Sequence, residues 1–291
     1  MELLIVGHSS FYLRNRWIKK GIEYIGKYPN ENAFSKSNLE AVDELGIGSV
    51  MVQSLRFWLN FLDIMKKEDK KFFPKRGIEQ ILEEDPYLQN NNALWLIHTY
   101  IMERDNKKEI PLIWNTFISN VSISVFDENS AENLIKLKLK EISKNSNLKI
   151  SDRSLKDSII VFIKTYYKEK NLNVDPEDNL SSPFVKLDYL QKNQENQYYF
   201  RNISSTEISE YIALYLIMRK FQKNEINLKE AYEHFNKIIK MRFSDYEKMV
   251  IRLENRNILS VDRAAGLQNI IIKKVLTENE IIERILESEN K

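Results

Sequence analysis

Apolar residues recur at helical spacing along most of the chain, with few interruptions. Only seven glycines and six prolines occur in 291 residues, so we expect helices to dominate. The first predicted helix runs from about Leu13 to Lys27. N-cap residue types at 35–38 predict a second helix through Leu45. After Gly46-Ile47-Gly48, Ser49 is predicted to cap a third helix that runs to about Met65. Two helices joined by a short glycine turn indicate a helix–turn–helix.

A polar, basic segment follows this helix pair. Residues 66–77 contain six basic and two acidic side chains and include Phe72-Phe73-Pro74. This composition predicts a short hairpin, as in the wing of a winged helix, with side chains suited to phosphate contact.

The same pattern recurs twice with less clarity. Asn129 predicts the start of a helix to about Lys144, although 135–140 alternates like a strand, and Ser151 predicts the start of the next helix. Segments 182–184 and 197–200 then flank a polar stretch, like a second wing. Further on, Ser244 predicts a helix through Glu254, and residues 258–262 and 267–272 predict a hairpin around Ala265-Gly266.

The expected fold is therefore mainly α with small β wings: several winged helix–turn–helix-like units packed with connecting helices. Packing helices are expected in the segments 86–104 and 205–241, the first segment beginning its helix at Pro86 after Asp85. We predict three parts: an N-terminal winged-helix-like domain at 1–105, a second at 106–204, and a C-terminal helical domain with a β-hairpin at 205–291.

The third predicted helix carries side chains that read DNA bases in other proteins. Ser49, Gln53, Arg56 and Asn60 fall on one stripe of this helix. Gln and Asn pair with adenine and Arg pairs with guanine through two hydrogen bonds each. The competing interpretation is the solvated face of an ordinary helix.

Two local basic zones extend this hypothesis. The chain as a whole has a net charge of only +2, so a footprint for a polyanion must be local. From Lys136 to Lys170 there are ten basic and four acidic residues. The lysine content by itself is also what an AT-rich genome produces. The predicted phosphate contacts are Lys66, Lys67, Lys70, Lys71, Lys75, Arg76, Lys149, Arg153, Lys156 and Lys164.

Composition excludes several kinds of chemistry. Cysteine is absent, which excludes disulfides, thiolate nucleophiles and cysteine-based metal sites. We expect a cytoplasmic protein, because no signal peptide or membrane-spanning apolar run is visible. His8, His98 and His234 are far apart, and His98 is expected to be a core histidine. Acidic clusters at 83–85 and 175–178 could hold Mg²⁺, but helix-start and loop positions explain them as well. No catalytic residue, metal or cofactor is predicted.

The N-terminal segment from Gly7 to Gly21 differs in kind from the rest. It places a histidine, aromatic side chains and four basic residues within fifteen positions. Its prominent residues are His8, Phe11, Arg14, Trp17, Lys19 and Lys20. Two interpretations stand side by side: a basic surface for phosphate or a partner, and a helix anchored by Trp17.

This segment resembles the opening signature of a bacterial family of unknown function, the one numbered four thousand and seven. Five later stretches resemble the same family in the same order, so the resemblance spans nearly the whole chain. They lie at 77–87, 94–98, 154–157, 182–187 and 265–267. Family members often carry cysteine before the Pro-Phe pair, where this chain has Ser182, which leaves no thiol for sulfur transfer at that position.

The resemblance implies a setting rather than an activity. Genes of this family commonly lie in anti-phage defence regions, beside a phosphoadenosine-phosphosulfate-reductase-like protein and a cysteine desulfurase, as in DNA phosphorothioation systems. The leading hypothesis is a non-catalytic DNA-binding or adaptor subunit of such a system. The alternatives are a scaffold that docks the sulfur-transfer enzyme and, more remotely, a metal-dependent nuclease.

Overall fold

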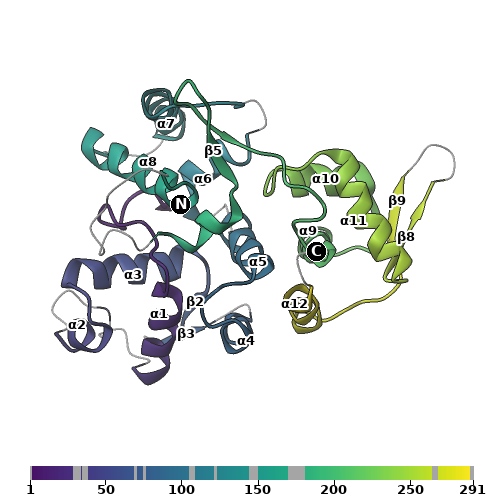
Figure 1. Ribbon diagram of the computed structural model, residues 1–291, viewed down its shortest axis with the longest axis horizontal. Coiled ribbons are helices and arrows are strands. Elements are labelled where there is room, and N and C mark those ends of the chain that lie inside the picture. Colours follow the sequence, from purple (N-terminus) through teal and green to yellow (C-terminus); the bar gives the residue numbers. More distant parts are fainter. Residues whose placement is uncertain are drawn as a thin grey trace.

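The computed structural model describes residues 2–28, 34, 39–68, 71–74, 77–104, 109–120, 123–143, 150–169, 181–263 and 268–288. The fold is mainly helical with small sheets, which confirms the coarse prediction (Figure 1). None of the helices within the described residues is long and apolar enough to cross a lipid bilayer. Figure 1 shows helices α1–α8 in one half of the molecule and α9–α12, with the β8–β9 hairpin, in the other.

In the first half, the elements follow one another closely. They are β1 (Glu2–Leu3), α1 (Trp17–Lys27), α2 (Leu39–Leu45), α3 (Ser49–Phe61), β2 (Met65–Glu68), β3 (Lys71–Pro74), α4 (Ile78–Glu84), α5 (Asn91–Met102), β4 (Glu109–Ile110), α6 (Leu112–Phe117), α7 (Glu128–Ser143) and α8 (Asp152–Tyr166).

The remaining elements begin with a short 3₁₀ helix. They are η2 (Pro183–Leu187), β5 (Leu190–Lys192), β6 (Tyr198–Phe200), α9 (Glu210–Phe221), β7 (Glu225–Asn227), α10 (Leu228–Asn236), α11 (Phe243–Asn255), β8 (Leu259–Asp262), β9 (Asn269–Ile272) and α12 (Glu278–Glu287).

The first predicted helix pair and the hairpin after it are both present as elements. Helices α2 and α3 flank Gly46, which has a positive φ of 61°. Strands β2 and β3 pair antiparallel, with Met65 opposite Pro74. Helix α3 ends at Phe61 rather than Met65, because Asp63 adopts a left-handed conformation at φ 54° and Met65 enters β2. Helix α1 likewise starts at Trp17, after the left-handed Arg16.

Three other predicted boundaries were wrong. Pro86 does not begin a helix, because the Asp85 carboxylate accepts the backbone N–H groups of Gln89 and Asn90, both at 2.8 Å, and holds a loop before α5. The start of α7 is set by Asp127, not Asn129, since Asp127 accepts the N–H of Ser130 at 2.7 Å. Ser244 lies inside α11, which begins at Phe243.

The structure also differs in part from the second predicted wing. Residues 183–187 form the 3₁₀ helix η2 instead of a strand, with Ser182 capping its start through a hydrogen bond from the Phe184 N–H. The hairpin is formed by β5 and β6, with Leu190 opposite Phe200. Pro183 supplies no backbone N–H and fits the first turn of such a helix.

The C-terminal hairpin of β8 and β9 is confirmed and has an additional strand. Strand β7 pairs antiparallel with β9, which gives a three-stranded sheet in the order β7-β9-β8. The chain thus runs helix α9, strand β7, helices α10 and α11, and then the hairpin. A short parallel pair, β1 with β4, was not predicted.

A buried hydrogen-bonded chain joins the two halves. Trp114 Nε1 donates to the Tyr166 hydroxyl at 3.1 Å, which lies 2.8 Å from Nδ1 of His98. His98 Nε2 lies 2.9 Å from the carbonyl oxygen of Ile238, so Nε2 carries the proton and Tyr166 donates to Nδ1. His98 is fully buried, as expected of a core histidine. The chain ties α5, α6 and α8 to the turn after α10.

Candidate nucleic-acid interface

The N-terminal segment lies between helices α3 and α8 (Figure 1). His8 Nε2 donates to the carbonyl oxygen of Ile5 at 3.1 Å and lies 3.2 Å from Oγ of Ser158 on α8. On the other side, the imidazole meets the Phe57 ring of α3 edge-on, with centroids 5.5 Å apart. Burial lowers the pKa of His8, so its imidazole is neutral at pH 7.

Gly7 makes this close approach to α3 feasible. Its φ is 124°, a conformation that side chains rarely adopt, and a Cβ here would lie 2.6 Å from Cδ2 of Phe57. The close contact with Phe57 therefore explains why this position of the family-like opening sequence is a glycine.

The predicted base-reading residues share one face of α3. Ser49 is exposed, while Gln53, Arg56 and Asn60 are half-buried. This face adjoins the side of α3 that carries Phe57 and meets the N-terminal segment. The structure thus groups the four residues but leaves their role as base readers a proposal.

A buried arginine fixes the end of this helix. Arg104 Nη1 donates to the carbonyl oxygen of Phe61 at 3.0 Å and also to that of Asn60. The carbonyl oxygen of Asn60 also accepts the backbone N–H of Asp63 at 2.9 Å, and the Arg104 cation complements the helix dipole. Sequence reasoning missed Arg104, because nothing local distinguishes it from a surface arginine.

Three predicted phosphate contacts form an exposed stripe on α8. Arg153, Lys156 and Lys164 lie on one face of the helix, and the stripe extends over about 16 Å at 1.5 Å per residue. Lys156 is partly neutralised by Glu132 of α7, with Nζ and Oε2 3.6 Å apart. Lys164 Nζ lies over the ring of Tyr12, 5.9 Å from its centroid, which connects the stripe to the N-terminal segment.

Most of the family-signature residues make contacts within the first half of the molecule. The backbone oxygen of Phe11 accepts the indole N–H of Trp58 at 3.0 Å, and the Arg14 guanidinium lies over the Trp17 ring. Lys20 donates to the carbonyl oxygen of Leu45 at 2.9 Å, at the end of α2. Lys19 lies over the Tyr87 ring, with Nζ 4.6 Å from the centroid. These contacts agree with the interpretation of a Trp-anchored helix.

Several predicted residues fall outside what the structure describes. Lys66, Lys67 and Lys71 lie on β2 and β3, where only the backbone is described, and Lys70, Lys75, Arg76, Lys149 and the acidic cluster at 175–178 lie outside the described residues. Within the described part, no group of three or more His, Asp or Glu side chains could hold a metal ion.

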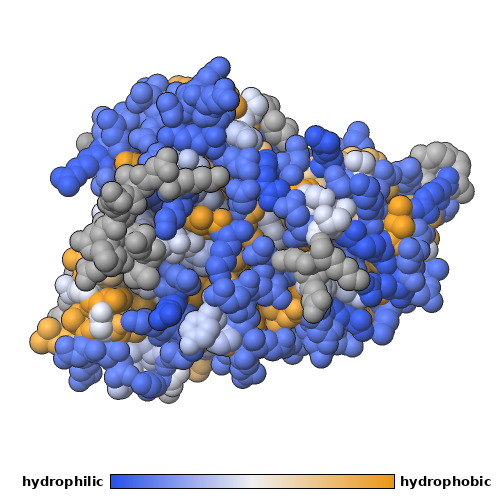
Figure 2. Space-filling model, in the orientation of Figure 1, coloured by the Kyte–Doolittle hydropathy of each residue, from blue (hydrophilic) through white to orange (hydrophobic). Residues whose placement is uncertain are grey.

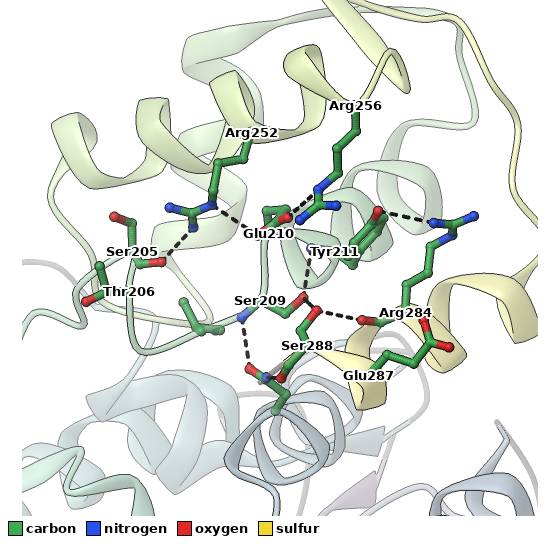
Figure 3. Close-up of a pocket in the computed structure, with 12 residues that line it drawn as sticks. Ser205, Thr206, Ser209, Glu210, Tyr211, Arg252, Arg256, Arg284, Glu287 and Ser288 are labelled. Atoms are coloured by element: carbon green, nitrogen blue, oxygen red, sulfur yellow. Dashed lines mark hydrogen bonds and ion pairs between the residues drawn. The ribbon is translucent and has the colours of Figure 1, made fainter. Parts of the chain in front are cut away.

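One polar pocket in the second half was not predicted. It has a volume of about 470 Å³ and contains Arg252, Arg256 and Arg284 together with Glu210 (Figure 3). The only sequence signal was the spacing of Arg252 and Arg256, which places both on one side of a helix. Their partner Glu210 lies on another helix, and local patterns do not reveal that pairing.

Comparison with known proteins adds the family and the fold. A family model described as "Protein of unknown function (DUF4007)" matches residues 6–288. No curated protein matches the sequence. Two solved structures, an SspB crystal structure and a magnesium-ion-bound SspB crystal structure, each share 18% sequence identity at a TM-score of 0.79. Each similarity covers 97% of this chain and 89% of the other. The chain therefore belongs to the family described as "Protein of unknown function (DUF4007)".

Proposed function

We propose that this protein is a non-catalytic DNA-binding subunit of a bacterial DNA-modification or anti-phage defence system, of the kind associated with DNA phosphorothioation. The observation that carries the proposal is the α8 stripe of Arg153, Lys156 and Lys164, joined through Tyr12 to the N-terminal segment that borders α3. Exposed basic side chains along a helix suit the sugar–phosphate backbone of a duplex.

The order of the C-terminal elements supports a winged helix. A helix, a strand, two helices and a hairpin, with the first strand paired to the hairpin, is the arrangement from α9 to β9. Winged helices bind DNA in many proteins, and in others they bind protein partners.

Equilibrium binding to a labelled DNA duplex tests the proposal. Fluorescence polarisation at low salt should show binding that weakens steeply as salt rises, because bound phosphates release counterions. Arg56→Ala should weaken binding to a preferred sequence more than binding to random DNA, whereas Lys164→Ala should weaken both alike. If Arg56→Ala, like Lys164→Ala, weakened binding to the preferred sequence and to random DNA alike, α3 would have no base-reading role. Absence of binding at low salt would contradict the proposal.

A second candidate function, docking of a sulfur-transfer enzyme related to phosphoadenosine-phosphosulfate reductase, has its own observations. The outward face of α11 is not basic: Lys248 pairs with Asp245 at 3.0 Å, and Ile251 is 44% exposed. A second apolar area lies over α2 and the start of α3, where Leu39 and Val50 are exposed (Figure 2). Co-purification of the neighbouring enzyme that survives nuclease treatment, and is lost in Ile251→Glu, would support docking.

The nuclease alternative has one observation in its favour, the magnesium ion in one of the similar SspB structures. Incubation of supercoiled plasmid with the protein and Mg²⁺ or Mn²⁺ tests it. The non-catalytic proposal predicts unchanged supercoiled DNA. Nicking that EDTA abolishes would contradict it.

A further inference from the structure

The pocket in the C-terminal half lies where three helices meet. The start of α9, the end of α11 and the end of α12 surround it, and Figure 3 shows side chains from all three pointing into the same space. The start of α5 also borders the pocket. Its Asn92 donates to the carbonyl oxygen of Ser288 at 2.7 Å and accepts the N–H of Ser209 at 2.8 Å. These bonds fix the pocket walls relative to one another.

Glu210 orients two of the arginines. Its carboxylate, with only 8% of the side chain exposed, accepts Nε of Arg252 at 3.0 Å and Nε of Arg256 at 2.9 Å, one on each oxygen. Arg252 also donates from Nη2 to the carbonyl oxygen of Ser205 at 2.6 Å. Both Nη atoms of Arg256 have no hydrogen-bond partner among the described residues, although the guanidinium is held in place through Nε.

Tyr211 separates the second arginine from the third. The guanidinium carbons of Arg256 and Arg284 lie 5.7 and 5.6 Å from the centroid of its ring. Arg284 Nη1 donates to the Tyr211 hydroxyl at 3.4 Å, while Nε of Arg284 is buried with no partner among the described residues. A buried charged donor without a partner is costly, and a bound anion would remove that cost.

The charges and donors together indicate the ligand. Glu210 compensates one of three guanidinium groups, and the other carboxylate at the pocket, Glu287, is exposed and screened by water. The remaining excess of positive charge matches a dianion. Guanidinium groups bind phosphate oxygens in pairs, and the Thr206 hydroxyl also lines the pocket. The Ser288 hydroxyl donates to the carbonyl oxygen of Arg284 at 2.6 Å and lies 2.9 Å from that of Ser209, so these two hydroxyls stabilise the pocket wall.

We propose that this pocket binds the phosphate monoester of a nucleotide, supplied either by a free mononucleotide or by the 5′-phosphate end of a DNA strand. Arg256 and Arg284 hold the phosphate oxygens, and Arg252 and Glu210 keep Arg256 in position. The volume of about 470 Å³ admits a nucleotide. This site is separate from the α8 stripe and does not depend on the proposed duplex binding.

Isothermal titration of the full chain tests this inference. The ligands are inorganic phosphate, deoxyadenosine monophosphate, deoxyadenosine, and one short single strand with either a 5′-phosphate or a 5′-hydroxyl. We expect binding of the phosphorylated ligands only. A strand that binds tighter than the mononucleotide identifies a DNA end as the source, and equal affinities identify the free nucleotide.

Two variants complete the experiment. Arg256→Gln should weaken binding of the phosphorylated ligands at least tenfold, and it should fold, because this side chain is 56% exposed. Arg263→Gln removes an exposed arginine that pairs with Glu254 at 3.1 Å outside the pocket, and it should bind like the parent chain. Equal affinity for deoxyadenosine and its monophosphate, no binding of any phosphorylated ligand, or an unchanged Arg256→Gln variant with a parental melting curve would overturn the inference.

Discussion

His8 lies 3.2 Å from the hydroxyl of Ser158, a residue 150 positions later in the chain. Ser158 in turn donates to the carbonyl oxygen of Ile5 at 2.8 Å, so the first residues of the chain are fastened to α8. The opposite side of the imidazole faces Phe57 of α3. The N-terminal segment thus joins the two helices whose exposed faces form the proposed DNA-binding surface.

The contact between this segment and α3 should tolerate no side chain at position 7. Gly7→Ala combines a positive φ with a Cβ 2.6 Å from the Phe57 ring, and we expect it to lower the free energy of unfolding by at least about 1 kcal/mol. Gly26→Ala is the matched control: it lies in α1 with nothing within 4 Å of the added Cβ. That change should raise the free energy of unfolding by about 0.5–1 kcal/mol. Urea denaturation measures both, and the same sign for both changes would contradict this interpretation.

Buried His98 should make stability depend on pH. Burial lowers its pKa from 6.5 to about 4, so the unfolded chain takes up a proton at a higher pH than the folded chain. The stability contribution of neutral His98 is present above pH 6.5 and is lost as pH falls from 6.5 towards 4. The loss amounts to roughly 3 kcal/mol, at about 1.4 kcal/mol for each pKa unit.

Thermal melting between pH 7.5 and 4.5 checks this dependence. The parent chain should lose stability more steeply over this range than His98→Gln, which has a lower but flatter profile. Parallel profiles of the two chains would show that His98 does not titrate as its burial requires.

We expect Arg104 to contribute more to the free energy of unfolding than an exposed arginine does. Its guanidinium is buried against the carbonyl oxygens that end α3, and Asp63 lies 3.9 Å away. Arg104→Met removes the buried charged donor to those carbonyl groups, and we expect a loss of about 3 kcal/mol in the free energy of unfolding. Arg153→Met, on the exposed face of α8, should change it by less than about 0.5 kcal/mol. Similar losses in both variants would contradict the assigned role of Arg104.

Local signals predicted the elements better than their boundaries. Gly46 marked the turn before α3 correctly, but Ser49 is the first residue of that helix and Gly48 is its N-cap, without a side-chain hydrogen bond. The Ser151 hydroxyl does cap α8 by accepting the N–H of Ser154 at 3.1 Å. Pro86 predicted a helix start that the structure lacks, because a loop stabilised by the Asp85 side chain competes with a helix at the same residues. Local periodicity cannot distinguish these outcomes.

The candidate sites were harder to predict than the helices and strands, because they depend more on contacts between residues far apart in the sequence. The stripes on α3 and α8 could be predicted, since each lies on one helix. The N-terminal segment between them could not, because it depends on His8 meeting Ser158 and Phe57. The arginine pocket was missed for the same reason: Glu210 and Arg252 lie on different helices, 42 residues apart.

The salt dependence of DNA binding tests the central claim most directly. If Arg153 and Lys164 contact phosphates, the slope of log affinity against log salt should fall by about 2 in Arg153→Ala/Lys164→Ala, at about 0.9 for each lost contact. The control Lys223→Ala/Lys229→Ala removes the same charge from exposed positions in the other half of the molecule and should keep the parental slope. Equal slopes for the parent chain and the α8 variant, or equal decreases in both double variants, would contradict the proposed DNA-binding surface.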